Sequence, residues 1–518
     1  MRKRRSVFDL SHEHKLTCDM GKLIPIFCED VLPGDTFKVK TDIVVRLQAL
    51  LAPIMHRVDV FTHFFFVPNR LIFDKWEDFI TGGEDGTDNT VAPTITADST
   101  NGFAIGSLAD YFGIPTGVPS LEVSALPFRA YDLIYNEWYR DENIIPEVNI
   151  STAAGADSTT STTLLSRAWE HDYFTKCLPW TQRGSQVSLP LSGGKVPVRF
   201  SSEGGVPYYK STVTTGSVFP SVYGGKSVVA CYSGDGFYNR FGSGESGSNL
   251  SQYGTDGLPL EVDLSSIGSS TINNLRQAFK VQQFMEISAR GGARYIESIL
   301  SHFGVKSSDY RLQRPVYLGG GRSPIVISEV LQTSSTSGTQ ALGDMGGHGF
   351  SAQRTHEFTR FFEEHGWIIG IMSIMPRTSY QQGLNRMWSR STRYEYYWPI
   401  FAHLGEQGVL NKEIYAQNPS VVDSSGVSVN EKVFGYLPRY QEYRERESQV
   451  HGQMRSTLDF WHMGRIFSSL PELNANFINS DPTKRIEAVT NEDNCLVNIY
   501  HNVKAIRPIP KKGVPGGL

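Results

Sequence analysis

The sequence predicts a mainly β protein, a β-sandwich or jelly roll whose strands are separated by long loops. Short β-branched and aromatic runs lie far apart along the 518 residues. The composition includes 49 Gly, 29 Phe and 23 Tyr, which favours sheets joined by loops. The run Phe64-Phe65-Phe66 puts bulk on both faces of a strand. Both faces must therefore be covered, either by the same domain or by another chain.

Strands and helices are expected at a few well-separated places. A helix is expected from Pro127 to Arg140, because proline is harmless at a helix start and the aromatic residues recur at helical spacing. A second helical region is expected from Thr271 to Phe303, interrupted at Gly291-Gly292. Residues 82–125 are rich in Gly, Thr, Asp and Pro and are expected to form a long loop. The expected strands are about 36–48, 57–67, 324–330, 366–375 and 496–506.

Composition indicates one domain over residues 1–518 that carries two distinct segments. Residues 1–30 begin with a basic cluster and are expected to be an arm lying on something else. Residues 184–258 are rich in Gly, Ser and Tyr and poor in aliphatic residues, so a surface insertion is expected there. Its aromatic residues indicate a binding surface, although a simple spacer explains the composition equally well. The candidate contact residues of this insertion are Tyr208, Tyr209, Phe237 and Tyr238.

The charge is distributed unevenly. The net charge is −4, so the protein as a whole is not a basic nucleic-acid binder. Basic residues are instead concentrated at the two ends, where they either hold phosphates or remain solvated. The candidate nucleic-acid contacts are Arg2, Lys3, Arg4, Arg5, Lys511 and Lys512.

The cysteines and the apolar runs indicate the cellular compartment of the protein. The five cysteines are scattered and include no CxxC, which suits a reducing compartment. No apolar stretch follows the N-terminal basic cluster, so a signal peptide is not expected. No apolar run approaches the roughly 18 residues of a membrane span, so membrane insertion is not expected either.

No motif predicts a catalytic centre, a cofactor or a metal site. Gly319-Gly320-Gly321 lacks the lysine of a phosphate loop and is interpreted as a turn, and Gly346–Gly349 as a loop. Glu363-Glu364-His365 lacks the spacing of a zinc protease motif and is expected to be a turn. The acid pair Asp141-Glu142 is weak evidence for glycosidase chemistry, since carboxylates are abundant. The spacing of the remaining metal-ligand candidates is too irregular for zinc: His12, His14, Cys18 and Cys28.

One aromatic cluster has two open interpretations. Tyr394, Tyr396, Tyr397 and Trp398 have the side chains that stack on unpaired bases. Such a cluster is more often part of a core or of a subunit interface.

Long, ordered motifs run from end to end of the chain: His56–Val60, Phe65–Arg70, Leu126–Tyr131, Tyr135–Trp138, His171–Trp180, Leu275–Phe279, Ala289–Glu297, Gln313–Gly321 and Asn502–Pro508. Together they resemble the major capsid proteins of the microviruses, small single-stranded DNA bacteriophages, and in particular the gokushovirus branch. The resemblance implies an eight-stranded antiparallel jelly roll of viral capsid type, with long loop insertions and a few short helices. No motif matches within residues 184–258, whose length and position resemble the variable gokushovirus insertion that protrudes at the three-fold axes.

The resemblance also implies a function and partners. Sixty copies would form an icosahedral T=1 shell around a circular single-stranded DNA genome, assembled in the bacterial cytoplasm. Further partners would be a small basic internal protein, pilot or spike-type minor virion proteins and a host surface receptor. The expected protein is structural rather than enzymatic. The alternative is a carbohydrate-binding or hydrolytic jelly-roll protein, which a secretion signal or a paired-carboxylate cleft would favour.

The basic arm Arg2-Lys3-Arg4-Arg5 is expected to face the interior of the shell and to contact DNA without sequence preference. The competing interpretation is an arm between subunits whose charges meet acidic loops.

Overall fold

The computed structural model describes residues 5–185, 187, 272–292, 294–331, 345–354 and 358–511, together with the backbone of short strands between residues 198 and 262. The chain divides into two compact units. The first contains Met1–Gly184 and Met285–Leu518, and the second contains Ser185–Phe284. The expectation of one domain therefore needs correction, because the second unit starts where the insertion was expected and continues beyond residue 258.

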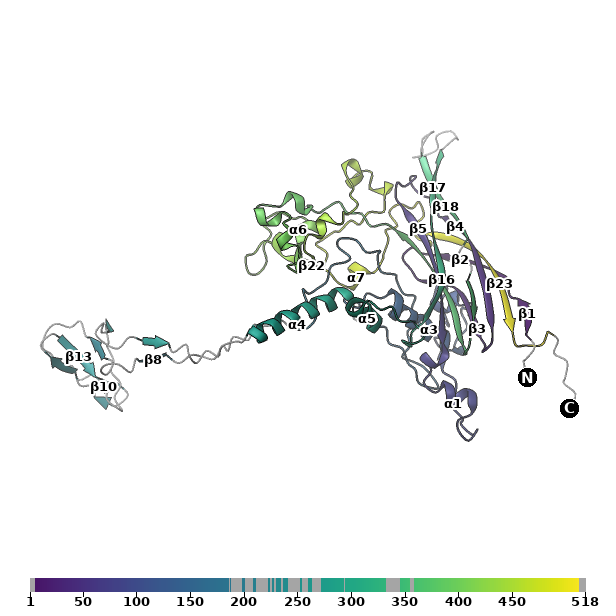
Figure 1. Cartoon of the computed structure of the whole chain (residues 1–518). Coiled ribbons are helices and arrows are strands. Elements are labelled where there is room, and N and C mark those ends of the chain that lie inside the picture. The colour runs from purple at the N-terminus through teal and green to yellow at the C-terminus, as the bar shows by residue number, and fades with distance from the viewer. Residues whose placement is uncertain are drawn as a thin grey trace. The chain divides into compact units, whose positions relative to one another are not determined.

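Two antiparallel sheets form the body of the first unit (Figure 1). The larger one, here called the β4 sheet, has the order β1-β23-β4-β18-β17, with β2 also paired to β23 and β19 to β4. The other, here called the β5 sheet, has the order β16-β5-β20-β3. The β4 sheet consists of β1 (Ser6–Asp9), β2 (His12–Cys18), β4 (Thr36–Leu47), β17 (Val326–Leu331), β18 (Met345–Arg354), β19 (Phe358–Phe361) and β23 (Cys495–Arg507). The β5 sheet consists of β3 (Ile24–Val31), β5 (Val58–Pro68), β16 (Val316–Pro324) and β20 (Gly366–Pro376).

The two sheets pack face to face through alternating apolar residues. Along β4, buried residues alternate with more exposed ones, as expected for a strand with one covered face. Phe37 of β4 lies in one buried cluster with Phe64 and Phe66 of β5. The core of the unit therefore lies between the sheets.

The aromatic run of β5 is covered on both faces. Phe64 and Phe66 face the core between the sheets, whereas Phe65 belongs to a second cluster with Phe128 and Tyr131 of α3 (Leu126–Ile134). This arrangement confirms that both faces are covered, and the cover comes from the same chain. It also confirms a helix that starts near Pro127, which continues as one π-helical turn, η2 (Tyr135–Tyr139).

The remaining elements are short, apart from helix α4. Helix α4 (Ile272–Gly291) begins in the second unit and ends in the first. In the first unit the others are η1 (Asn69–Leu71), α1 (Trp76–Thr81), β6 (Thr94–Thr96), α2 (Leu108–Tyr111), β7 (Glu122–Ser124), α5 (Tyr295–Phe303), η4 (Arg386–Trp388), η5 (Arg393–Glu395), η6 (Pro399–Phe401), β21 (Glu406–Leu410), α6 (Asn411–Ile414), η7 (Val429–Glu431), β22 (Val433–Pro438), η8 (Gln441–Tyr443), η9 (Gly452–Arg455), η10 (Asp459–Trp461) and α7 (Ala475–Ile478). In the second unit they are β8 (Val198–Phe200), β9 (Tyr208–Lys210), β10 (Val222–Tyr223), β11 (Lys226–Ser227), β12 (Ala230–Ser233), β13 (Gly236–Arg240), β14 (Gln252–Tyr253) and β15 (Leu260–Val262).

The N-terminal segment is not a separate arm from Ser6 onward. Strands β1 and β2 pair with β23, and β3 pairs with β20. Ile24 and Ile26 are buried in the core between the sheets, and Leu23 is buried in the cluster around α3, so this segment is needed to complete both sheets. Residues 1–4 lie outside the described residues.

Two glycine-rich stretches that were interpreted as irregular are strands. Gly319–Gly321 lie in β16 and pair with β5, next to a register shift at Tyr317. Gly346–Gly349 lie in β18 and pair with β17. Glycine is required because backbones approach closely: a Cβ on Gly320 would lie 2.1 Å from the carbonyl oxygen of Thr62.

The expected loop at residues 82–125 is also more ordered than composition suggested. It contains β6, α2 and β7, and Phe103 and Leu108 are buried in the cluster around α3. The segment therefore covers part of the outer side of the β5 sheet. Glu363–His365 is a bend before β20, as expected.

Candidate nucleic-acid interface

The structure brings the two ends of the chain together. Strand β1 pairs with β23 so that Ser6 lies opposite Arg507. Arg5 is exposed, and its guanidinium carbon lies 5.1 Å from the ring centroid of Phe361 in β19. Lys511 is exposed, four residues after Arg507. Arg2, Lys3, Arg4 and Lys512 lie outside the described residues.

The same sheet has an exposed face that is basic. Residues directly opposite each other in an antiparallel pair share a face, and Lys38 of β4 lies opposite Lys504 of β23. Arg46 lies opposite Leu496, and Lys15 of β2 opposite Asn498. The basic sheet face is defined by Lys15, Lys38, Lys40, Arg46, Arg354 and Lys504, and its acidic residues are Asp9, Glu13 and Asp42.

These acidic residues only partly neutralise the face. The Nζ atom of Lys15 lies 2.5 Å from a Glu13 carboxylate oxygen, and Nε of Arg354 lies 2.9 Å from a carboxylate oxygen of Asp42. Hydrogen bonds from the Ser11 hydroxyl and backbone N–H lower the pKa of Asp9, with a smaller contribution from Lys504. Among the described residues of this face, six cations and three carboxylates sum to a formal charge of +3, in a chain whose net charge is −4.

Aromatic rings lie among these cations. Tyr500 is 42% exposed and lies opposite both Asp42 and Glu13. Phe350 of β18 lies opposite Arg46, whose guanidinium carbon is 6.0 Å from its ring centroid. Cations that follow a backbone, interleaved with rings that stack on bases, are typical of surfaces that bind single-stranded nucleic acid.

On the opposite face of the β4 sheet, a buried histidine of β23 bonds to both sheets. His501 is buried, with its Nδ1 2.9 Å from the Thr41 hydroxyl and its Nε2 2.8 Å from the Ile26 carbonyl oxygen. Burial, reinforced by the nearby His12, lowers the pKa of His501 to about 3. His501 is therefore neutral at pH 7 and links both sheets without adding charge.

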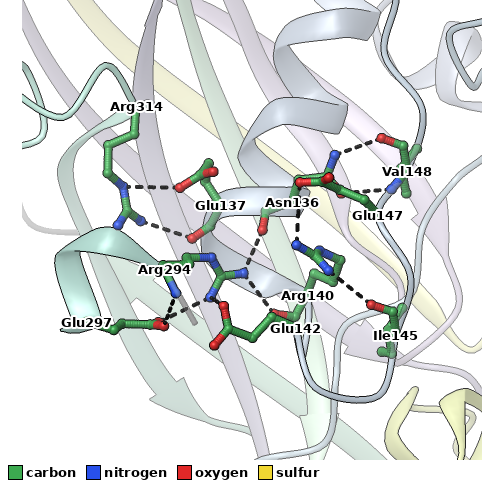
Figure 2. Close-up of polar contacts among 10 residues, drawn as sticks. All are labelled: Asn136, Glu137, Arg140, Glu142, Ile145, Glu147, Val148, Arg294, Glu297 and Arg314. Carbon is green, nitrogen blue, oxygen red and sulfur yellow. Dashed lines mark hydrogen bonds and ion pairs between the residues drawn. The ribbon is translucent and has the colours of Figure 1, made fainter. Parts of the chain in front are cut away.

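Glu142, of the acid pair Asp141-Glu142, is tied into a structural network (Figure 2). Glu142 lies 3.9 Å from the Arg294 guanidinium, which also contacts Glu297 at 3.2 Å. Arg294 donates further hydrogen bonds to the carbonyl oxygens of Asn136 and Arg140. Glu142 thus neutralises a cation that holds the start of α5 against η2.

A second arginine of this network is held by the same π-helical turn. Nε of Arg314 lies 3.6 Å from a Glu137 carboxylate oxygen, and Arg314 donates a hydrogen bond to the Glu137 carbonyl oxygen (Figure 2). Its guanidinium carbon lies 4.4 Å from the ring centroid of Trp138. This part of the chain therefore joins elements, and the carboxylates of Glu137, Glu142 and Glu297 are each paired with an arginine.

The other sequence candidates are placed as follows. Tyr394, Tyr396, Tyr397 and Trp398 are about half exposed and are not part of a core. Across the described residues, no three His, Cys, Asp or Glu side chains are grouped so that they could hold a metal ion. None of the helices in that part of the chain is both long and apolar enough to cross a membrane.

The candidates of the insertion are described by their backbone alone. Tyr208 and Tyr209 lie in β9, and Phe237 and Tyr238 in β13. The two strands pair, with Tyr209 opposite Asn239. The structure thus brings the four positions to neighbouring strands.

Sequence reasoning missed the basic sheet face. The spacing of Lys38 and Lys40 within an alternating strand could have assigned both to its polar side. Their position opposite β23 depends on a pairing between the two ends of the chain, which has no local signal.

Comparisons with known proteins agree with this picture of a structural protein. The family described as capsid protein (F protein) matches residues 1–517. The chain belongs to this family. Capsid protein VP1 of Chlamydia phage 1 is 40% identical over 582 aligned positions, which cover 99% of this chain and 96% of the relative. Capsid protein VP1 of Bdellovibrio phage phiMH2K is 40% identical over 525 positions, with coverage of 99% and 95%. Capsid protein VP1 of Spiroplasma virus 4 is 30% identical over 544 positions, again with coverage of 99% and 95%.

The protein is therefore the major capsid protein of a microvirus-type phage and part of a virion. Its relatives are structural capsid proteins, a non-enzymatic family, which excludes the hydrolytic alternative. As a capsid protein it works as part of an oligomeric assembly.

Proposed function

We propose that this capsid protein assembles into an icosahedral T=1 shell of sixty copies, encloses a circular single-stranded DNA genome and contributes to attachment to the host. The basic sheet face carries the part of the proposal that concerns DNA. A chain with a net charge of −4 has a formal charge of +3 among the described residues of one exposed sheet face, and Arg5 directly precedes β1 of the same sheet. A shell whose inner wall alone meets phosphate requires such a distribution.

The subunit is an eight-stranded jelly roll in this proposal. The strand orders support it: β2-β23-β4-β18 on one sheet and β3-β20-β5-β16 on the other. If these eight strands are numbered along the chain, the orders become 1-8-3-6 and 2-7-4-5. That alternation between two facing four-stranded sheets is the connectivity of a jelly roll. Strands β1, β17 and β19 are then additions to the first sheet.

The basic sheet face lines the interior of the shell. Its cations and the basic ends Arg2–Arg5, Lys511 and Lys512 hold phosphates without regard to sequence, and Tyr500 offers a ring for stacking. The small basic internal protein implied by the resemblance shares this work. Residues 184–258 form the outer protrusion at the three-fold axes and meet the host receptor, through Tyr208, Tyr209, Phe237 and Tyr238. Pilot or spike-type minor proteins complete the virion, which is assembled in the bacterial cytoplasm.

The DNA assignment is tested by the double variant Lys40→Gln/Lys504→Gln. Fluorescence anisotropy with a labelled oligothymidine measures binding over a range of salt concentrations. Each lost phosphate contact should reduce the slope of log affinity against log salt by about 0.7. The matched control is Lys306→Gln/Arg311→Gln, which removes the same charge from exposed positions outside the face. Equal slopes for both variants would contradict the assignment.

The arm requires its own variant, with Arg2, Lys3, Arg4 and Arg5 all changed to Gln. Shells should still form but should retain less DNA, measured as the absorbance ratio at 260 and 280 nm of purified particles. If shells fail to form and oligonucleotide binding is unchanged, the arm connects subunits instead.

A further inference from the structure

We infer that an arginine-aromatic surface on residues 388–404 and 439–446 is a contact between subunits, and that its occupant is the acidic segment 74–88 of a neighbouring copy. The inference rests on the proposed self-assembly. It identifies which two surfaces of neighbouring copies contact each other. It concerns a part of the molecule separate from the basic sheet face.

Large aromatic side chains are exposed on this surface. Trp388 is 72% exposed, and Tyr396 and Trp398 are about half exposed. Tyr394, Tyr397 and Tyr443 are exposed to a similar extent. Clustered exposed apolar residues mark interaction sites, and Trp, Tyr and Arg are the residues that contribute most at protein interfaces.

The aromatic residues are held in place by their own backbone contacts. Nε1 of Trp398 donates a hydrogen bond to the Arg393 carbonyl oxygen at 2.8 Å. The Tyr440 hydroxyl donates to the Tyr396 carbonyl oxygen at 3.0 Å, and Nη2 of Arg439 donates to the Tyr394 carbonyl oxygen at 3.2 Å. A surface that is already ordered loses less conformational entropy when it is buried, so it is suited to association.

Guanidinium groups already cover ring faces that bases would need. The Arg390 guanidinium carbon lies 4.4 Å from the Tyr443 ring centroid and 5.4 Å from that of Tyr396. The Arg393 guanidinium carbon lies 4.8 Å from the ring centroid of Tyr394. Stacking of unpaired bases requires open ring faces. One face of each of these three rings is therefore already occupied, and the acidic segment described below makes a protein partner the proposed occupant.

The surface contains five arginines and three glutamates, a formal charge of +2, which favours an acidic partner. Among the described residues, Arg393, Arg439 and Arg444 have no carboxylate oxygen within 4.0 Å, so each brings uncompensated charge to the surface. If two copies met through the same surface, these guanidinium groups would face one another and repel. The contact is therefore head-to-tail, with a different surface on the second copy.

A matching surface lies around helix α1. Segment 74–88 includes six carboxylates and a single cation, Lys75, which pairs with Asp78 at 3.1 Å. Phe79 and Ile80 are 37% and 49% exposed there, so apolar groups are available beside the charges. Charge and apolar surface are thus complementary on both sides. A head-to-tail contact forms a closed ring when its rotation closes, as the proposed shell requires.

The test is a charge exchange between the two surfaces. One variant is Arg393→Glu/Arg444→Glu, the other is Glu77→Arg/Glu84→Arg, and the third combines all four changes; the four native side chains are exposed. Sedimentation measures the fraction of the chain that forms particles. Because like charges across an interface cost several kcal/mol, each double variant should form at least about tenfold fewer particles. The combined variant should recover assembly, since its opposite charges face each other again.

Controls separate a loss of this contact from a general effect of charge or a loss of folding. Lys306→Glu/Arg311→Glu changes the net charge as much as the first variant and should assemble normally. Circular dichroism checks that every subunit is folded. As a second measurement, the two double variants are mixed, and they should associate with each other although neither associates with itself.

Other results would contradict the contact itself, the choice of a protein partner, or the proposed self-assembly. Normal assembly of the Arg393→Glu/Arg444→Glu variant, or no recovery by the combined variant and the mixture, would overturn the inference. Normal shells that lack DNA in the first variant would assign the surface to nucleic acid instead. If the unmodified chain forms no particles, the proposed self-assembly fails, and the mixing measurement alone decides whether the two surfaces meet.

Discussion

Arg129 forms a fully buried ion pair that fastens a loop to α3. Its Nε donates to a carboxylate oxygen of Asp157 at 2.8 Å, and its remaining donors reach the carbonyl oxygens of Ile72 and Ala153 at 2.9 Å. Arg129→Met should lower the free energy of unfolding by about 3–5 kcal/mol, because it leaves the Asp157 carboxylate buried without its cation. Urea denaturation of the subunit measures the change. A loss below about 1 kcal/mol would mean that water replaces the guanidinium.

Asp132, on the same helix, should make stability depend on pH. Burial raises the pKa of its carboxyl to about 8, with a further contribution from Asp157 and partial compensation by the Ser161 backbone N–H. In the unfolded chain this pKa is about 4. The folded chain therefore keeps a proton that the unfolded chain releases between these values, and stability falls as pH rises from about 4 to about 8.

Asp132→Asn should remove this dependence. At pH 7.5 the free energy of unfolding should rise by an amount on the order of a few kcal/mol, and the melting temperature should rise with it. Near pH 4 both should change little. Asp85→Asn, at an exposed position, is the control. An equal effect at both pH values would show that packing, not ionisation, determines the result.

At the scale of single elements, β16 depends on a glycine. A Cβ on Gly320 would lie 2.1 Å from the Thr62 carbonyl oxygen, whereas a Cβ on Gly346 of β18 would meet nothing closer than 3.7 Å. Gly320→Ala should therefore cost about 1–3 kcal/mol through displacement of the neighbouring backbone, and Gly346→Ala should cost much less. Thermal melts of the two variants measure the difference. Equal melting temperatures would contradict the close approach of β16 and β5.

The same elements show what the sequence could and could not predict. Strands β4, β5, β20 and β23 were predictable because their β-branched and aromatic runs are strong local signals. The glycine runs of β16 and β18 were interpreted as a turn and a loop, because close approach to Thr62 or Ala52 is visible only in the folded chain. For the candidate site, the basic ends were predictable from composition. The pairing of Lys38 with Lys504 across β4 and β23 could not be predicted, since register between distant strands has no sequence signal.

At the scale of the whole molecule, the two compact units should be separable. Replacement of residues 184–258 by a short Gly/Ser linker should leave the first unit folded, because its sheets and buried clusters are formed by other residues. Its melting temperature should stay within a few degrees of that of the full chain, and attachment to host cells should be impaired. Calorimetry and a cell-binding assay measure the two effects. A variant that cannot fold would place the segment in the core of the subunit.

Strand β23 has a consequence for how the protein is made. It pairs with β4 on one side and with β1 and β2 on the other, although it is the last strand along the described residues. A nascent chain on the ribosome therefore has an open gap in the β4 sheet until residues 495–507 have been made. Products that stop before residue 495 expose unpaired strand edges and lack the partner of the first strands. Because only a chain that contains residues 495–507 can close the sheet, shortened products of this kind should not join a particle.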